Sequence, residues 1–242
     1  MKTILITGSS RGIGAAIARQ AHAKGYIVIL HGRTNSPSLQ KLHAELIGSH
    51  VIYCDIAYKT ATLTTIKQVI EKIGPIDVLV TNAATAHPTI CDISDIDDTI
   101  ATHEYAVNFL GTIHCIQAVL PDMQVRGKGC IITISSIKGH PKLTTLSSVT
   151  YGATKSSVIA LTKALAKAYP TIRFNSVSPG YVLTDQAKQW GKKSQERIRN
   201  GSVLGRAAEP TEIAAMVLYL ASDNASYMTG ADFVVDGGYS LK

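Results

Sequence analysis

The chain has 242 residues and a mass of 25.8 kDa, with 45% hydrophobic and 17% charged residues, a balance typical of one globular domain. No run of residues approaches the ~18 uninterrupted apolar residues of a membrane span, and the apolar part of the opening "MKTILITG" is too short for a secretion signal. We therefore expect a soluble, cytoplasmic protein of a single domain. The four cysteines form no Cys-x-x-Cys pair and the eight histidines no metal-binding spacing, so no metal site is expected.

The net charge is +7, and the basic residues are scattered apart from a cluster between Lys188 and Arg206. No aromatic residues interleave with the basic ones, so the pattern indicates neither a nucleic-acid surface nor a membrane surface. An acidic substrate or partner, or simply a solvated surface, remains compatible with this charge.

Short apolar strands alternate with amphipathic helices along the chain. Strands are predicted at 3–7, 26–30, 50–54, 76–82, 129–136, 172–180 and 232–238. Helices are predicted from the first glycine-rich turn to about residue 23, and at 38–46, 62–74, about 97 into the 120s (ending at or soon after Pro121), 156–169 and 210–222. The segment from about 183 to 206 is polar and basic with little periodicity, which predicts a mobile substrate lid. The alternation predicts an α/β fold with a Rossmann-type, doubly wound parallel sheet of about seven strands.

The sequence "TGSSRGIG" places Gly8, Gly12 and Gly14 between the first strand and the first helix. Glycines let the backbone approach a phosphate, and the start of a helix offers free N–H groups. A glycine triplet in this position indicates a dinucleotide-binding loop, although its spacing differs from Gly-x-Gly-x-x-Gly.

The end of the second strand reads "ILHGRTN", with Gly32 and Arg33 where NAD-binding sheets often carry a carboxylate for the ribose 2′-hydroxyl. Arg11 lies in the glycine loop as well. The planar guanidinium suits a 2′-phosphate, so the pattern favours NADP(H) over NAD(H), unless both arginines simply face water.

In "YGATK", Tyr151 and Lys155 are four residues apart and share one face of a helix. A neighbouring ammonium favours the phenolate, so the lysine is expected to lower the pKa of the tyrosine toward the range useful for proton transfer. A single pair of this kind also arises by chance, and its meaning depends on the surrounding motifs.

These motifs occur together with "TNAA", Val107–Asn108, "ISS" and "SPGYVLTD", in an order and spacing that resemble the short-chain dehydrogenase/reductase family from Thr3 to about Gly238. Within that family, the chain resembles the 3-oxoacyl-[acyl carrier protein] reductases, and the "VDGG" near the C-terminus also resembles that branch.

The resemblance implies the role of each matching residue. Tyr151 matches the proton donor or acceptor, Lys155 the residue that tunes its pKa and holds the nicotinamide ribose, and Ser136, rather than Ser135, the hydroxyl that binds the substrate oxygen. Asn108 matches the asparagine that anchors a water beside the lysine. The cofactor contacts implied in addition to Tyr151 and Lys155 are Gly8, Ser10, Arg11, Gly12, Ile13, Gly14, Arg33, Asp55, Ile56, Asn82, Ala83, Pro179, Gly180, Val182 and Thr184.

The function implied is that of an NADPH-dependent ketoreductase acting on a 3-oxoacyl thioester bound to an acyl carrier protein. Two alternatives remain: a reductase of another ketone, such as a sugar, polyol, quinone or polyketide, and a catalytically idle dinucleotide-binding sensor or scaffold. The family also implies a homotetramer, built on the long central helices and on the helix at Pro210 with the last strand. An acidic carrier is expected to meet a basic rim, for which the candidates are Lys188, Lys192, Lys193, Arg197, Arg199, Arg126 and Lys128.

Two departures from the family pattern bear on these expectations. Ala84 stands where the family usually has glycine, and a positive φ there would strain the backbone. The segment between Ser136 and Tyr151 is about two residues longer than usual and carries His140, Pro141 and Lys142. Because this segment borders the substrate, the sequence does not fix which ketone is bound.

Overall fold

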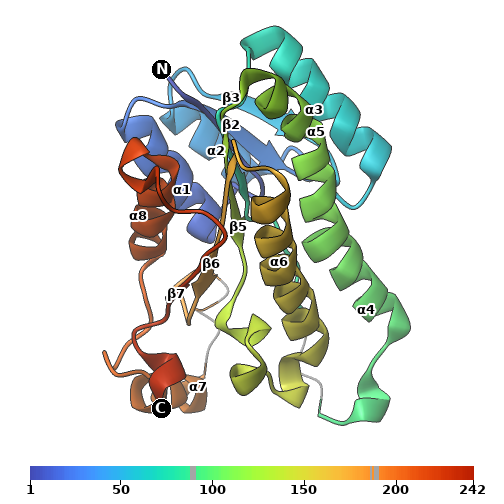
Figure 1. Cartoon of the computed structure of the whole chain (residues 1–242). Coiled ribbons are helices and arrows are strands. Elements are labelled where there is room, and N and C mark those ends of the chain that lie inside the picture. The colour runs from blue at the N-terminus through green and yellow to red at the C-terminus, as the bar shows by residue number, and fades with distance from the viewer. Residues whose placement is uncertain (88–90, 186, 188–190) are drawn as a thin grey trace.

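The computed structural model describes residues 1–87, 91–185, 187 and 191–242, without the side chains of 193 and 194. Within these residues, seven parallel strands form one sheet in the order β3-β2-β1-β4-β5-β6-β7 (Figure 1). The strands are β1 (Thr3–Ile6), β2 (Ile27–Gly32), β3 (His50–Tyr53), β4 (Val78–Thr81), β5 (Cys130–Ile134), β6 (Arg173–Pro179) and β7 (Asp232–Val235). The predicted doubly wound fold of a single domain is confirmed.

Helices cover both faces of this sheet (Figure 1). Alternate residues of a strand point to opposite faces, so Ile4 and Ile6 of β1 pack in one core cluster and Leu5 in the other. The first cluster lies under α1 and α8 and the second under α3 and α5. The helices are α1 (Gly12–Ala23), α2 (Pro37–Glu45), α3 (Lys59–Ile73), α4 (Asp98–Tyr105), α5 (Gly111–Arg126), α6 (Val149–Ala168), α7 (Lys192–Gly201) and α8 (Pro210–Ala221).

Three helices differ most from the sequence prediction. Helix α6 begins at Val149, seven residues before its predicted start at 156. The segment predicted to be an irregular lid contains α7, whose one buried apolar residue, Ile198, left too little periodicity to reveal a helix. Helix α5 runs through Pro121 to Arg126, because a proline removes one hydrogen bond while Leu120 and Met123 pack this turn into the core. The helix ends at Gly127, whose φ of 63° is left-handed.

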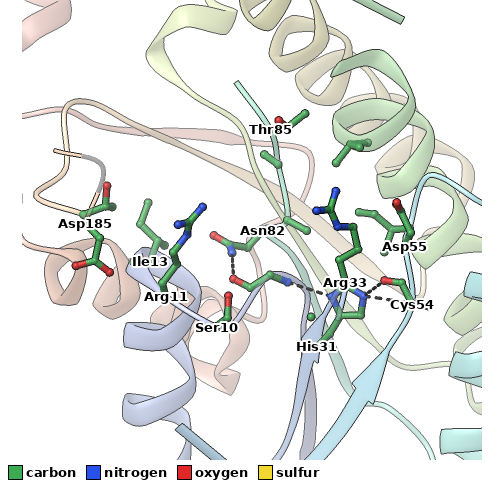
Figure 2. Close-up of a pocket in the computed structure, with 18 of the residues that line it drawn as sticks. Ser10, Arg11, Ile13, His31, Arg33, Cys54, Asp55, Asn82, Thr85 and Asp185 are labelled. Atoms are coloured by element: carbon green, nitrogen blue, oxygen red, sulfur yellow. Dashed lines mark hydrogen bonds between the residues drawn. The ribbon is translucent and has the colours of Figure 1, made fainter. Parts of the chain in front are cut away.

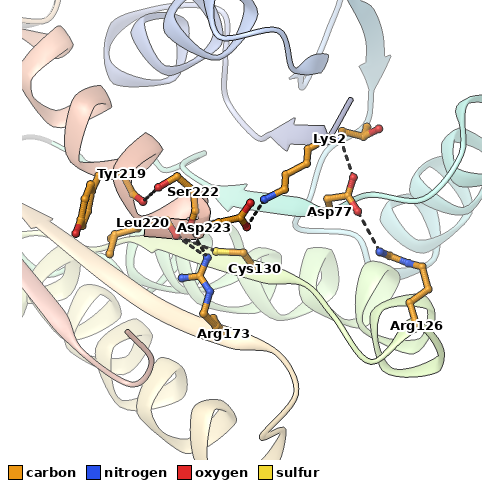
Figure 3. A network of polar contacts seen from close by, with 10 residues as sticks. Lys2, Asp77, Arg126, Cys130, Arg173, Tyr219, Leu220, Ser222 and Asp223 are labelled. Carbon is orange, nitrogen blue, oxygen red and sulfur yellow. Dashed lines mark hydrogen bonds and ion pairs between the residues drawn. The ribbon is translucent and has the colours of Figure 1, made fainter. Parts of the chain in front are cut away.

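The basic residue Arg126 does not lie at the carboxyl ends of the strands, where the predicted site is. Its guanidinium donates to Asp77 (3.0 Å, Figure 3), to Asp122 (2.8 Å) and to the carbonyl oxygen of Ile76 (2.7 Å) just before β4. The amino ends of parallel strands all lie at one end of the sheet, so Arg126 lies at the end opposite the predicted site. The expectation that it contributes to a rim around the substrate is wrong.

The C-terminal residues brace α7. Lys242 Nζ donates to the carbonyl oxygens of Asn200 (3.0 Å) and Ser202 (3.2 Å) at the end of that helix. The ring of Tyr239 lies 5.1 Å from the ring of Tyr181, which follows β6. The chain end is therefore part of the wall beside the carboxyl ends of the strands. No helix in the described part of the chain combines the length and the apolar character needed to cross a membrane.

Candidate active site

Two adjoining cavities of about 440 and 470 Å³ lie at the carboxyl ends of the central strands. They share Ile13, Asn82, Ala84 and Thr184, so together they form one trough across the sheet. The trough crosses the point where the chain changes direction, because β1 pairs with β2 on one side and β4 on the other. Ligands of open α/β sheets bind at such a switch point.

The glycine loop closes the first cavity against β1 and β4 (Figure 2). Gly8 has a φ of 64°, and a Cβ atom there would lie 2.7 Å from the Cα of Ala83. A Cβ atom on Gly14 would lie 2.4 Å from the carbonyl oxygen of Gly8. The amide of Asn82 donates to the carbonyl oxygens of Thr7 and Gly8, both at 3.0 Å. The loop is thus held so that the free N–H groups at the start of α1 face the cavity, an arrangement suited to a phosphate.

His31, which no motif had indicated, holds this loop from below. Its Nδ1 accepts from the backbone N–H of Gly8 (3.2 Å) and its Nε2 donates to the carbonyl oxygen of Cys54 (3.0 Å), as Figure 2 shows. These partners require the neutral ring. Burial lowers the pKa of His31 to about 4, which keeps the ring neutral at physiological pH. Its partners are 23 residues away in sequence on either side, so no local pattern could reveal it.

The first cavity carries the expected charges. The exposed side chains of Arg11 and Arg33 line it at separate places, Arg11 near Ile13 and Asp185 and Arg33 near Asp55 (Figure 2). Asp55 also lines it, with its carboxylate accepting from the N–H of Ala57 at 3.0 Å. A Cβ atom on Gly32 would lie 2.7 Å from Leu39 Cδ2, so the end of β2 has little room for a carboxylate. The residues present fit a dinucleotide, with the guanidinium of Arg33 beside Asp55 after β2 and that of Arg11 on the glycine loop.

The second cavity brings together Ser136, Tyr151 and Lys155. Lys155 is 3% exposed, and its Nζ lies 5.7 Å from the centre of the Tyr151 ring and donates to the carbonyl oxygen of Ile134 at 2.7 Å. The hydroxyl of Ser135 donates to the carbonyl oxygen of Lys155 at 2.8 Å, which commits it to the contact between β5 and α6. Ser136 is the serine whose hydroxyl is paired with Tyr151, as the sequence order suggested.

The pKa of Tyr151 beside Lys155 differs from the expectation. Burial raises the pKa of Tyr151 to about 12, the hydrogen bond with Ser136 acts in the opposite direction, and the charge of Glu104 raises it further. Burial also lowers the pKa of Lys155 to about 8. The expected lowering of the tyrosine pKa is therefore wrong for the protein alone: loss of water is the largest effect on this pKa, and the group that lowers it is Ser136.

Two glycines set the distance between α6 and the loop after β5. A Cβ atom on Gly152 would lie 2.7 Å from the carbonyl oxygen of Lys138, and one on Gly139 would lie 2.8 Å from the carbonyl carbon of Lys155. This close packing places the Ser136 loop beside Tyr151.

Asn108 ties the end of β4 to α6. It lies in a π-helical turn, Ala106–Leu110, between α4 and α5. Its Oδ1 accepts from the N–H of Thr85 (2.8 Å), and its Nδ2 donates to the Thr85 carbonyl oxygen (2.9 Å) and to Thr154 Oγ1 (3.1 Å). Its predicted part in holding a water remains a prediction.

The remaining predicted contacts line the two cavities. Ser10, Ile13, Ile56 and Ala83 lie in the first, and Pro179, Gly180, Val182 and Thr184 in the second. Ala84 carries no strain, since no non-glycine residue in the described part of the chain has a positive φ. Of the basic residues expected near the mouth, Lys188 lies outside the described residues, as does the side chain of Lys193.

Glu104 is a second residue that the motifs did not reveal. It is 1% exposed, and its Oε1 accepts from the backbone N–H of His87 at 2.8 Å and lies 3.1 Å from His87 Nδ1. Its Oε2 has no hydrogen-bond partner. Both residues line a third cavity that shares Tyr151, Ser147 and Ser148 with the second. Glu104 lies four residues before Asn108, one helical turn away. This spacing is the sequence pattern from which Glu104 could have been found.

The fold and the trough define an oxidoreductase that uses a nicotinamide dinucleotide. The family model described as "Enoyl-(Acyl carrier protein) reductase" matches residues 8–240. The sorbose reductase sou1 of Schizosaccharomyces pombe is 37% identical over 98% of this chain and 95% of its own length. The 3-oxoacyl-[acyl-carrier-protein] reductase FabG of Staphylococcus aureus is 32% identical over 98% and 97%.

Solved structures agree with these relatives. The crystal structure of gox2181 superposes with a TM-score of 0.94 at 27% identity, covering 100% of this chain and 96% of that one. A short chain dehydrogenase/reductase family protein superposes with a TM-score of 0.88 at 31% identity, covering 100% and 98%. The chain belongs to the short-chain dehydrogenase/reductase family.

Proposed function

We propose that the protein is an NADP(H)-dependent reductase that interconverts a ketone and a secondary alcohol. The observation that carries this proposal is the joining of two cavities: Ser136, Tyr151 and Lys155 line one, and Arg11 and Arg33 line the other. A dinucleotide with a 2′-phosphate that spans both places its nicotinamide end beside the tyrosine.

In the mechanism we propose, the bound cofactor supplies the hydride, and the side chains handle the oxygen of the substrate. The hydroxyls of Ser136 and Tyr151 donate to the carbonyl oxygen as it gains negative charge, and Tyr151 transfers its proton to it. The ammonium of Lys155 stabilises the phenolate that remains. Asn108 and the close packing at Gly152 hold α6 in place for this step.

Replacing Tyr151 by phenylalanine tests the proton donor. We expect Tyr151→Phe to lower kcat at least a hundredfold, since it removes only the phenolic hydroxyl, and to leave NADPH binding, measured by its fluorescence, near that of the wild type. Tyr227→Phe, at a fully exposed tyrosine, is the control. A Tyr151→Phe variant that keeps more than a tenth of wild-type kcat would rule out the assignment.

Cofactor preference tests the role of the arginines. We expect Arg33→Ala to lower kcat/KM for NADPH about tenfold or more while changing it little for NADH, because only NADPH carries the 2′-phosphate. The exposed Lys41→Ala on α2, which does not line the cavity, is the control. An unchanged ratio between the two cofactors in both Arg33→Ala and Arg11→Ala would show that the arginines only face water.

For the substrate, the first candidate is a 3-oxoacyl thioester held by an acyl carrier protein, in a cytoplasmic homotetramer. The extent of the match to FabG and the description of the family model support it. Apolar side chains suit a tetramer interface, since Tyr219 on α8 and Val234 on β7 are each 42% exposed. Light scattering after gel filtration tests the tetramer, which the Tyr219→Glu variant is expected to weaken.

A small, polar ketone is the second candidate. The described walls of the second cavity carry the polar side chains of Ser147, Ser148, Lys138 and Arg197, which suit a hydroxylated substrate better than an acyl chain. The 37% identity to a sorbose reductase also favours a small, polar ketone as the substrate. NADPH oxidation with a short 3-oxoacyl thioester, compared with sugars, polyol-derived ketones and quinones, separates the candidates. A chain that oxidises NADPH with none of them would be the idle sensor or scaffold.

A further inference from the structure

The second cavity has an excess of positive charge. Among the described residues, its lining includes Lys138, Lys155 and Arg197 and no aspartate or glutamate. Lys155 has its role beside Tyr151 and donates to the carbonyl oxygen of Ile134. Neither Lys138 nor Arg197 takes part in the proton transfer proposed above, so their presence in the wall needs another explanation.

Lys138 is fixed beside the residue that binds the substrate oxygen. Its backbone N–H donates to the Ser136 hydroxyl at 3.1 Å, and its carbonyl oxygen packs on Gly152, so its position follows that of the catalytic loop. Its Nζ donates to the carbonyl oxygen of Leu143 at 3.2 Å, and an ammonium has two further donors. Lys138 is half-buried, and burial together with the charge of Arg197 lowers its pKa. The two cations are thus close enough to repel each other.

Arg197 reaches the cavity from α7. Its guanidinium carbon lies 5.8 Å from the centre of the Tyr181 ring, which is itself held by Tyr239. In the described part of the chain, neither Arg197 nor Lys138 has a carboxylate partner within salt-bridge distance. Two cations from different elements therefore face one cavity without a protein counter-charge.

We propose that Lys138 and Arg197 form a subsite for an anionic group, a carboxylate or a phosphate, carried by the substrate on the same small molecule as its carbonyl group. An anion there relieves the repulsion between the two cations and gains charge-assisted hydrogen bonds from both. It also fixes the direction in which the carbonyl group approaches Ser136 and Tyr151. This inference rests on the proposed reductase function and narrows its substrate class.

Matched pairs of ketones test the subsite: 4-oxopentanoate against its methyl ester for a carboxylate, and fructose 6-phosphate against fructose for a phosphate. With NADPH saturating, we expect the wild type to show at least a tenfold higher kcat/KM for the charged member of one pair. Lys138→Met and Arg197→Met should each lower that value at least tenfold more than the value for the neutral member, mainly through KM. Lys163→Met, at an exposed lysine of α6 that lines neither cavity of the trough, should change neither.

Calorimetric titration of the NADP⁺-loaded enzyme with 4-oxopentanoate and with fructose 6-phosphate gives a readout that does not depend on turnover. Binding of one of them that is weakened by Lys138→Met and Arg197→Met, and kept in Lys163→Met, supports the subsite. If neither anion binds the wild type, or if the variants affect charged and neutral ketones equally, the inference is wrong. The reductase function fails separately, when none of the ketones, including the neutral ones and the thioester, oxidises NADPH.

Discussion

At the scale of single residues, the proposed proton donor, Tyr151, is influenced by a buried carboxylate on α4. Glu104 is almost fully buried, has one oxygen without a partner, and lines a cavity in common with Tyr151. Its negative charge raises the pKa of Tyr151, after the larger effect of burial. The tyrosine therefore stays protonated to higher pH than it would beside a neutral residue, which suits a donor of protons.

The Glu104→Gln variant tests this influence. Reduction needs the protonated phenol, so activity falls as pH rises through the pKa of Tyr151. Removing the negative charge favours the phenolate, and we expect this fall in the pH profile of kcat/KM to move to lower pH. Glu71→Gln, at an exposed position on α3, should leave the profile unchanged. A profile in Glu104→Gln that is unmoved or moved to higher pH would contradict the argument.

At the scale of elements, the site depends on how closely the loop after β5 packs against α6. A methyl group at Gly152 would meet the backbone of Lys138, which has no flexible end that can move aside. We expect Gly152→Ala to displace Ser136 from Tyr151, lowering kcat about tenfold or more and costing about 1–3 kcal/mol of stability. The control is Gly191→Ala, where a Cβ atom meets nothing within 4 Å. Wild-type kcat in Gly152→Ala would show that the loop has room to adjust.

His31 of β2 joins the glycine loop to the segment after β3 through hydrogen bonds to Gly8 and Cys54. These bonds need the neutral ring, so they are sensitive to acid. In the folded protein burial lowers its pKa from 6.5 to about 4, so the unfolded chain binds a proton first as pH falls. This contribution to stability is complete above pH 6.5 and is lost between 6.5 and about 4, a loss of about 3 kcal/mol by linkage.

Chemical unfolding at several pH values measures this loss. A His31→Gln variant should show a smaller decrease in the free energy of unfolding between pH 6.5 and 4 than the wild type. The control, His22→Gln, replaces a partly exposed histidine of α1 and should keep the wild-type dependence. Equal decreases in His31→Gln and wild type would mean that the ring accepts a proton without disturbing the loop.

The elements also show what the sequence reveals and what it does not. Apolar strands, the glycine loop and the pair Tyr151–Lys155 were all predictable, because each depends on residues close together in sequence. Helix α7 was missed because its face toward the protein is small and carries a single apolar residue, Ile198. His31 and Glu104 were missed because their roles come from partners that only the folded sheet brings near, and no short pattern encodes them.

At the scale of the whole molecule, the positive charge is divided between the two edges of the sheet. Arg126 is held by acidic partners at the amino ends of the strands (Figure 3), while Lys192, Arg197 and Arg199 of α7 lie beside the carboxyl ends. If an acidic carrier protein delivers the substrate, α7 is the surface it meets.

Salt dependence distinguishes a carrier from a free substrate. We expect added salt to lower kcat/KM for a carrier-bound 3-oxoacyl substrate well beyond its effect on a small thioester, because screening weakens the attraction between large charged surfaces. The Lys192→Glu/Arg199→Glu variant should reproduce this loss at low salt. The control is Lys128→Glu, near Arg126 at the opposite edge. Equal salt sensitivity for the two substrates would leave the free ketone as the better candidate.

The contact between the chain end and α7 has a practical consequence for anyone who prepares this protein. Lys242 and Tyr239 support the helix that carries Arg197, so a bulky label attached at Lys242 would disturb the substrate wall directly. Met1, in contrast, is 98% exposed, and the following Lys2 pairs with Asp223 away from the trough. Attachment through Met1 therefore leaves the trough at the carboxyl ends of the strands free.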